Sequence, residues 1–379
     1  MNNIIYIGMD VHSTSYSLCS RFSQDPDVLF METQIKPETK YVLKYVQNAV
    51  KHVKDCYGMD AKVICAYEAG CLGYTLARDL IKEGIDCRIM APSSMPARQK
   101  NQIKNDTVDA RKICQYLMFN TVSYVHLPSE EDESVNDYIN MRNDVQLMVK
   151  AVKQQILALC MRYHKTFDKS RWSLEHRKWL KTITFDAAET RRTLDEYLLL
   201  LQQLEEKIER FDRHITEMAH SPDYEERTRL LTAFPGVREL TALTILVQTN
   251  DFERFSKARC YASYLGLVPG EVSSGTHQRR TGITKSGNRT IRKLLIQSMA
   301  SYIRWKAGRK SAALKKRQEG LKPEYIAYVD KGVKRIGSRY WKLSQRMNCN
   351  AAKTAAAREL ACFIWGAMTG HTEVGKIIA

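Results

Sequence analysis

Short apolar runs alternate with helical stretches over the first third of the chain. Four runs have the length and β-branched content of strands: Ile4–Met9, Ser15–Arg21, Lys62–Tyr67 and Asp86–Met90. The second run alternates well enough to be a hairpin partner of the first. Tyr74–Glu83 has a helical pattern and ends before Gly84. Strands that alternate with helices predict an α/β layer domain over residues 1–126.

A long helical section follows, over residues 127–228. Its apolar residues recur at steps of three and four: Leu194, Leu198, Leu201, Leu204, Ile208, Phe211, Ile215 and Met218. This spacing over more than three heptads predicts a coiled coil or a long helical hairpin, with Val145–Cys160 as an antiparallel partner. The alternative is a helix that packs on its own domain.

From residue 229 onward, Pro and Gly break the pattern into shorter helices. LLTAFPGVRELTALTIL predicts a helix, a P-G-V turn and a second helix from about Glu239, and backbone N–H groups at such a turn can hold a DNA phosphate. The Ser-, Gly- and Thr-rich stretch that follows predicts a loop running into a helix at Arg289. Tyr325–Met368 is expected to be helical again. Residues 229–379 are therefore predicted to be a mostly helical domain.

Composition narrows the class of protein. Of the 379 residues, 44% are hydrophobic and 27% charged, which is typical of a soluble globular chain. No apolar run is long enough to span a membrane, and the start has neither a basic segment nor a cleavage site. The ten cysteines are scattered without a C-x-x-C pair and are interpreted as reduced thiols. We expect a cytoplasmic protein.

Positive charge is concentrated in one region. Lys and Arg exceed Asp and Glu by 59 − 42 = +17, and residues 277–346 hold 20 of the basic residues against three acidic ones. The remaining 39 of each sign cancel. Aromatic residues lie between the charges: Tyr302, Trp305, Tyr325, Tyr328, Tyr340 and Trp341. This pattern predicts a surface for a nucleic-acid backbone. The alternative, a solvated basic surface, usually mixes the two signs.

Four carboxylates stand where a metal site could form. Asp10 and Glu68 each follow a predicted strand, and Asp106 and Asp109 share one face at the start of a predicted helix. Carboxylate oxygens are what two hard cations need in order to polarise a phosphodiester between them. Taken singly, Asp106 or Asp109 could be a helix cap instead.

The whole chain resembles the DEDD transposases of bacterial insertion sequences, the bridge-RNA-guided recombinases related to Piv-type invertases. The first part resembles their RuvC-like, ribonuclease-H-type domain. The last part resembles their transposase domain through the P-G-V turn, YASYLGLVPGEVSSG and GITKSGNRTIR. The resemblance covers nearly the full length, and the second block is specific. It implies an α/β plus α fold with a RuvC-like domain, a helical coiled-coil section and a helical transposase domain.

The resemblance also implies a set of site residues. Asp10, Glu68, Asp106 and Asp109 match the D-E-D-D metal ligands, for two Mg²⁺ ions with Mn²⁺ as a substitute. In the family a serine of an S-G loop attacks DNA, which here points to Ser274, with Ser273 as the open alternative. A serine hydroxyl needs activation and a cationic surround. The expected nucleic-acid contacts are Arg279, Arg280, Lys285, Arg289, Arg292 and Lys316.

The expected partners are donor DNA, target DNA and a guide (bridge) RNA, in a homodimer or homotetramer associated with a bacterial nucleoid. No RNA-binding motif is present, so the RNA follows from the resemblance alone. Two other functions stay open. A junction-resolving nuclease would use only the carboxylates, and a DNA-binding protein without activity would use neither site.

Overall fold

The computed structural model describes residues 3–96, 106–274, 277–304 and 309–372. The chain divides into two compact units, Met1–Leu127 and Pro128–Ala379, each described by itself below. The predicted three-part division, with limits at 126 and 228, stays a prediction. The structure has the mixed α/β and α composition that the sequence indicates, while the RuvC-like assignment stays a prediction.

The first unit is built on a six-stranded sheet with the order β3-β2-β1-β4-β5-β6. Its strands are β1 (Ile4–Val11), β2 (Tyr16–Phe22), β3 (Asp25–Ile35), β4 (Lys62–Glu68), β5 (Asp86–Met90) and β6 (Tyr124–Val125). The four predicted strands are confirmed, and β1 and β2 form the predicted hairpin. β4 pairs in parallel with both β1 and β5. Sequence reasoning missed β3, whose side chains are all exposed or half-buried.

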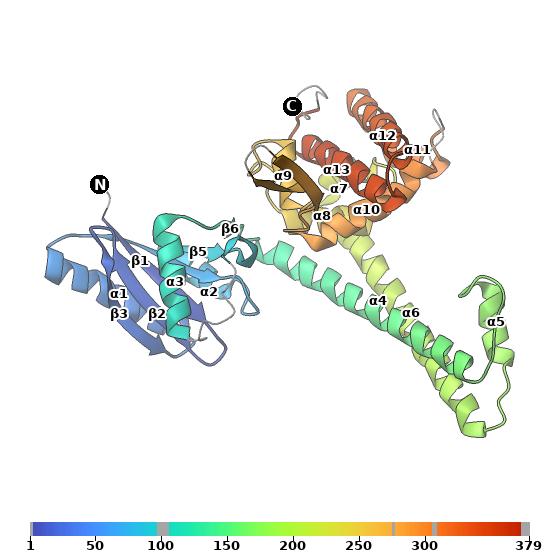
Figure 1. The fold of residues 1–379 in the computed structure, drawn as a ribbon, viewed down its shortest axis with the longest axis horizontal. Helices are drawn as coiled ribbons and strands as arrows, with labels where there is room; N and C mark the ends of the chain where they lie inside the picture. The colour runs from blue at the N-terminus through green and yellow to red at the C-terminus, as the bar shows by residue number, and fades with distance from the viewer. Residues whose placement is uncertain (1–2, 97–105, 275–276, 305–308, 373–379) are drawn as a thin grey trace. The chain divides into compact units, whose positions relative to one another are not determined.

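Helices cover both faces of this sheet (Figure 1). They are α1 (Thr39–Tyr57), α2 (Thr75–Lys82) and α3 (Asp106–Phe119), with a short 3₁₀ turn η1 (Pro92–Ser94). Helices α1 and α2 pack with Ile5, Ile7 and Met9 in one apolar core. Helix α3 packs on the opposite face, where Ala66 and Ile113 meet. Successive strand residues point to opposite faces, so each β1 residue belongs to one of these two layers.

The second unit begins with a long helical hairpin, α4 (Glu130–Arg162) and α6 (Ala188–Ala219), with α5 (Leu174–Thr182) between them (Figure 1). Residues early in α4, such as Ile139, pack with residues late in α6, such as Ile215. Ile156, near the other end of α4, packs in a cluster with Leu194. This antiparallel pairing confirms the predicted hairpin and the partner at Val145–Cys160.

The rest of the second unit is a helical domain around one apolar core. Its helices are α7 (Glu225–Thr232), α8 (Glu239–Thr249), α9 (Ala258–Tyr264), α10 (Arg289–Ile303), α11 (Ala312–Gln318), α12 (Pro323–Ser344) and α13 (Cys349–Met368). The predicted helix, P-G-V turn and second helix from Glu239 are confirmed, as are the helix start at Arg289 and the helical tail. Helix α13 is buried almost all round.

One predicted loop is wrong. The Ser- and Gly-rich stretch before Arg289 contains a hairpin of β7 (Pro269–Ser274) and β8 (His277–Ile283), paired with Val272 opposite Arg279. Gly, Ser and Thr are common in loops, so their frequency hid the strands. Among the described residues, no helix is long and apolar enough to cross a membrane.

Candidate functional site

Two of the predicted metal ligands end neighbouring parallel strands. In the pairing of β1 with β4, Met9 lies opposite Tyr67, so Asp10 and Glu68, the next residue on each strand, reach the same edge of the sheet. Both residues are partly exposed, and the Asp10 side chain is 17% exposed. The sheet therefore places two carboxylates together at an edge that solvent can reach.

Both residues belong to the face that α3 covers. Met9 and Tyr67 are buried in the core with α1 and α2. Because strand side chains alternate, Asp10 and Glu68 point to the other face. On that face Ala66, two residues before Glu68, packs in the cluster that includes Ile113 of α3.

Gly8 brings α3 very close to this edge. A Cβ atom added to Gly8 would lie 2.2 Å from the backbone oxygen of Ala110 and 2.4 Å from the backbone nitrogen of Cys114. Only glycine permits a helix backbone to rest on a strand backbone in this way. The Cys114 Sγ donates to the carbonyl of Tyr6 at 3.3 Å, so α3 runs opposite to β1 along the contact.

This direction carries the start of α3 toward Asp10. From Ala110 back to Asp106 the helix covers about 6 Å, and from Gly8 to Asp10 the strand covers about 7 Å. Asp109 directly precedes Ala110, and its side chain is partly buried. The α3 backbone starts at Asp106, whose side chain lies outside the described ones. Backbone geometry thus gathers all four predicted positions at one end of the sheet.

Sequence reasoning missed His12. Its Nε2 lies 3.4 Å from Oδ2 of Asp10, an ion pair when the imidazole is protonated. The D-x-H spacing was the available signal, because residues two apart on an extended chain point the same way.

The donor chemistry fits Mg²⁺, since all four predicted ligands offer carboxylate oxygens. Among the side chains that the structure describes, however, no three of the His, Cys, Asp and Glu type are close enough to hold an ion. The side chain of Asp106 is not among these described side chains. The four positions therefore share an edge of the sheet, and the exact set of ligands stays a prediction.

The predicted nucleophile lies at the end of a hairpin strand in the second unit. Ser274 is the last residue of β7 and pairs with His277, and Ser273 pairs with Gln278. Residues 275 and 276, which follow, lie outside the described ones, as do the side chains of both serines. The backbone places both candidates at the tip of the hairpin, and the choice between them stays open.

Arg292 is held by hydrogen bonds inside the protein, and its predicted contact with nucleic acid stays a prediction. Its side chain is buried on α10. The guanidinium donates to the carbonyls of Leu265 and Ser286, at 2.7 and 2.9 Å, and to that of Lys285 at 2.9 Å. Burial lowers the pKa of Arg292, and the neighbouring charge of Arg289 lowers it further. Arg292 therefore joins the segment after β8 to the end of α9.

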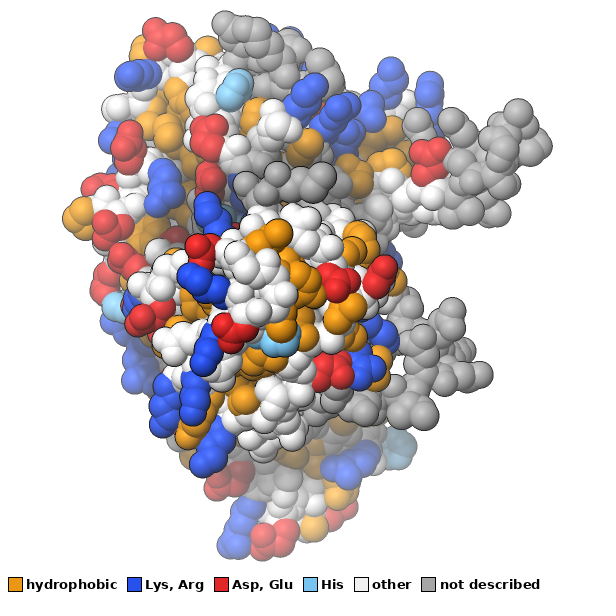
Figure 2. Space-filling view, turned by 90° about the vertical axis from the view of Figure 1, so that its left-hand side faces the viewer, with side chains coloured by type: hydrophobic (Ala, Val, Ile, Leu, Met, Phe, Trp, Pro, Cys, Tyr) orange, Lys and Arg blue, Asp and Glu red, His pale blue; other side chains and the backbone are white. Residues whose placement is uncertain are grey.

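The structure describes the side chains of some of the other predicted nucleic-acid contacts but not of all. Lys285, Arg289 and Lys316 are exposed, while the side chains of Arg279 and Arg280 lie outside the described ones. Figure 2 shows one face of the molecule, on which Lys and Arg are interspersed with Asp and Glu over much of the surface. Charge over this face therefore does not single out a surface for nucleic acid.

The P-G-V turn between α7 and α8 is held tightly. Gly236 has a φ of +79°, and a Cβ there would lie 2.6 Å from the backbone oxygen of Ser298. The Ser298 hydroxyl donates to the Gly236 carbonyl at 3.0 Å. Helix α8 then starts after Arg238 without a side-chain cap. A glycine is needed here both for the left-handed backbone and for the close approach to α10.

The helix–turn–helix, the hairpin and α10 lie in the part of the chain that matches a known family. The family model described as "Transposase IS116/IS110/IS902 family" matches residues 228–314. The putative transposase y4qE of Sinorhizobium fredii is 30% identical over 305 residues, 80% of this chain and 74% of that protein. The transposase for insertion sequence element IS1533 of Leptospira borgpetersenii is 29% identical over 262 residues, 68% of this chain and 73% of the relative.

A third relative extends the similarity to another insertion sequence. The transposase for insertion sequence element IS1111A of Coxiella burnetii is 25% identical over 283 residues, 72% of this chain and 76% of the relative. These matches run well beyond residues 228–314. The chain belongs to the IS116/IS110/IS902 family of transposases.

Proposed function

We propose that this insertion-sequence transposase breaks and rejoins DNA with two groups of its own. The carboxylates of Asp10, Glu68, Asp106 and Asp109 would bind Mg²⁺, and Ser274 would attack the DNA. The observation that carries the proposal is the close contact of α3 with Gly8, because it brings the start of α3 to the strand ends that carry Asp10 and Glu68.

Each carboxylate has a definite part in this proposal. Asp10 and Glu68 would hold their oxygens at fixed positions on the sheet, while Asp106 and Asp109 would supply oxygens from the helix. Two Mg²⁺ ions bound there would stabilise the charge that develops on the scissile phosphate. His12, which lies 3.4 Å from Asp10, would orient that carboxylate.

The serine would form and then lose one covalent bond. Its hydroxyl oxygen would bond to phosphorus as one P–O bond of the DNA breaks, its proton passing to a base or water and the leaving oxygen taking up a proton. In rejoining, a hydroxyl of the partner DNA would attack the same phosphorus and release the serine. The DNA would therefore exchange ends without a net change in the number of phosphodiester bonds.

The two groups come from different units, so the proposal needs them to meet. Either the hairpin of one chain reaches its own carboxylates, or it reaches those of a second copy. Mixing Asp10→Asn chains with Ser274→Ala chains distinguishes the two cases. Recombination by the mixture would indicate a site shared between copies, since neither variant alone has a complete site. No recombination, with both chains folded and assembled, would indicate a site within one chain.

The proposed guide is an RNA transcribed next to the gene, as the resemblance to bridge-RNA-guided recombinases implies. Base pairing would then select the target, and the protein would recognise shape and backbone. Adding and omitting that transcript in the same reaction tests this part. Equal recombination of the same target without RNA would remove the guide from the proposal.

One reaction tests the function as a whole. Purified protein is incubated with a labelled donor and target DNA, Mg²⁺ and the flanking transcript, and the products are separated on a denaturing gel. Exchanged strands support the proposal. Hydrolysis alone would assign the protein to the nucleases, and binding without cleavage would leave only a DNA-binding role.

A further inference from the structure

A groove of about 670 Å³ lies beside the Pro235–Gly236 turn. Five cationic side chains from separate parts of the chain line it: Arg238, Arg304, Arg309, Lys310 and Arg317. Among the residues that the structure describes, no acidic and no aromatic side chain lines this groove. We call it the Pro235 groove. Positive side chains therefore predominate along its described lining.

The turn forms one rigid side of the groove. Gly236 rests against α10, where its carbonyl accepts from Ser298 at 3.0 Å. The next helix, α8, begins directly after Arg238 without a side-chain cap. The first N–H groups of a helix have no partners within that helix, and they carry partial positive charge. Arg238, which directly precedes α8, lines the groove together with the turn.

Helix α11 forms another side and is fixed to the end of α7. Arg317 Nε donates to the carbonyl of Thr232 at 2.8 Å, and Gln318 Nε2 donates to that of Ala233 at 3.1 Å. These carbonyls lie at the end of α7, where helix carbonyls lack partners within the helix. The groove is thus shaped by bonds inside the protein before any ligand binds.

Like charges face one another in the Pro235 groove. Burial lowers the pKa of Arg317, and the positive charge of Arg238 lowers it further, while Glu239 partly offsets this effect. Lys310 is paired with Asp330 at 2.7 Å. Crowded guanidinium groups repel each other until an anion lies between them, and they bind phosphate oxygens with paired N–H donors.

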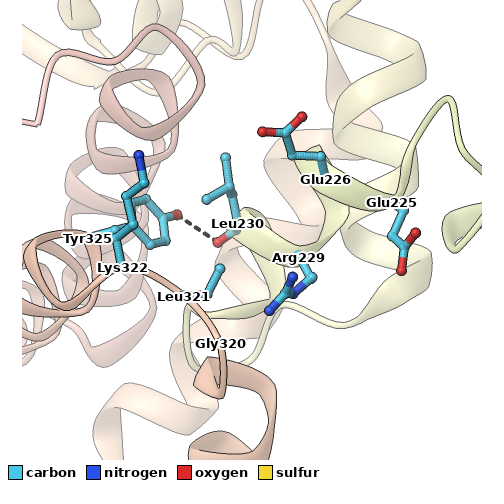
Figure 3. A pocket seen from close by; sticks show the side chains of 8 residues that line it. All are labelled: Glu225, Glu226, Arg229, Leu230, Gly320, Leu321, Lys322 and Tyr325. Carbon is cyan, nitrogen blue, oxygen red and sulfur yellow. Dashed lines mark hydrogen bonds between the residues drawn. The ribbon is translucent and has the colours of Figure 1, made fainter.

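A second pocket in the same unit has a different charge pattern from the Pro235 groove. It measures about 530 Å³ and is lined by both signs, with Glu225 and Glu226 beside Arg229 and Lys322 (Figure 3). Tyr325 donates to the carbonyl of Leu230 across it, at 2.7 Å. The two carboxylates there would repel a phosphate. The mixed charges of this pocket therefore do not favour an anion, in contrast to the cationic lining of the Pro235 groove.

We propose that the Pro235 groove binds backbone phosphates of duplex DNA, with Arg238, Arg309 and Arg317 as principal contacts. The proposal rests on the proposed function, because it assigns to the groove the DNA that the transposase recombines. It adds a binding site whose lining includes neither the predicted serine nor the predicted carboxylates. Contacts to phosphates position a protein on DNA without reading its sequence.

The cations of the groove suit a duplex. Guanidinium groups bind phosphate oxygens with paired N–H donors, and the phosphates of a duplex are regularly spaced along it. RNA binding is accordingly an outcome that would contradict the proposal.

The test is the salt dependence of DNA binding by the full chain. A labelled 30-base-pair duplex of random sequence is titrated by fluorescence anisotropy at several salt concentrations, and a single-stranded RNA of equal length forms a second arm. The variant is the double substitution Arg238→Gln with Arg309→Gln. The matched control is Arg210→Gln with Arg213→Gln, which removes two exposed arginine charges from α6 that do not line the groove. Circular dichroism melting checks that all chains fold alike.

Each lost phosphate contact lowers the slope of log affinity against log salt by about 0.9, which at 0.15 M salt is about a fivefold loss. We expect the groove variant to lose about 1.8 from the slope and about 30-fold in affinity for the duplex, and the control to lose clearly less. An unchanged slope, an equal loss in the control, or a loss confined to RNA would each overturn the proposal. A wild type that binds no duplex would overturn the groove proposal as well, whereas the proposed function is judged separately by the recombination reaction described above.

Discussion

The backbone of Gly8 lies against that of Ala110, so closely that a Cβ on Gly8 would be 2.2 Å from the Ala110 oxygen. We predict that Gly8→Ala pushes α3 off the sheet and lowers the free energy of unfolding by about 1–3 kcal/mol or more. The rate of DNA cleavage should fall by more than the lost stability accounts for, because the start of α3 moves away from Asp10. Urea denaturation and a cleavage assay measure the two effects.

Gly70→Ala is the matched control for this change, since the atom nearest to an added Cβ there is 3.9 Å away. It should leave both measurements near the wild-type values. A folded, fully active Gly8→Ala protein would show that the close contact does not position the carboxylates.

The second prediction concerns the carboxylates themselves. Asp10→Asn and Asp109→Asn each remove a charge from a partly exposed position, so the fold and DNA binding should persist while cleavage in Mg²⁺ is lost. Cleavage is followed on gels, and binding by anisotropy. Recombination near the wild-type rate in either variant would show that the metal-ligand assignment is wrong.

The third prediction concerns the hairpin serine. Wild-type protein should form a DNA adduct that survives denaturant, because a phosphoserine ester is covalent. Ser274→Ala should form neither the adduct nor recombinants, with its melting temperature unchanged. If the adduct persists, Ser273→Ala is the next variant to test. If neither serine matters, cleavage is hydrolytic and the junction-resolving nuclease becomes the better description.

The fourth prediction compares a buried arginine, Arg292, with an exposed lysine, Lys316. Arg292→Met leaves three carbonyls without their donor, so we expect a loss of roughly 2–4 kcal/mol in the free energy of unfolding. Lys316→Gln, on an exposed side chain, should leave stability unchanged and lower the salt slope of binding by about one if it contacts a phosphate. An Arg292→Met protein as stable as the wild type would show that the three hydrogen bonds of Arg292 do not stabilise the fold.

The fifth prediction is a pH dependence in the helical hairpin. Glu205 accepts from Arg177 at 2.7 and 2.8 Å and is paired with Lys153 at 2.7 Å, and these partners lower its pKa to about 2. The stabilisation should be complete above pH 4.5 and disappear as the pH falls toward 2. Because the carboxylate is 28% exposed, we expect about 1–2 kcal/mol after screening.

Glu205→Gln isolates this effect from the general acid sensitivity of the chain. The difference in unfolding free energy between wild type and variant should be largest at pH 7 and close to zero near pH 2. A difference independent of pH would show that the pair contributes through packing alone.

The sequence predicts those parts of the fold whose pattern is local. Apolar runs identified β1, β4 and β5, and heptad spacing identified the α4–α6 hairpin, because burial repeats with the period of the element. The β7–β8 hairpin escaped because Ser and Gly suit both loops and strand ends. Arg292 escaped because counting charges treats each arginine as exposed, and its burial depends on carbonyls brought to it by the fold.

The candidate sites also differ in whether a local sequence pattern indicates them. Asp10 and Glu68 could be proposed because each follows a predicted strand. This signal is useful because the parallel strands β1 and β4 run in register, which brings the two residues to the same end of the sheet. The Pro235 groove could not be proposed as a whole, since Arg238 and Arg317 lie 79 residues apart in the sequence. Only the packing of α11 on the end of α7 brings them to one groove.

That packing sets an order of events during synthesis on the ribosome. The end of α7 and the Pro235 turn leave the ribosome long before Arg317, Gln318 and Tyr325, whose side chains bond to the last α7 carbonyls. Until those residues emerge, the groove has only part of its wall and of its charge. A nascent or prematurely ended transposase would therefore lack a complete groove, and full binding of DNA would await a chain extended past α11.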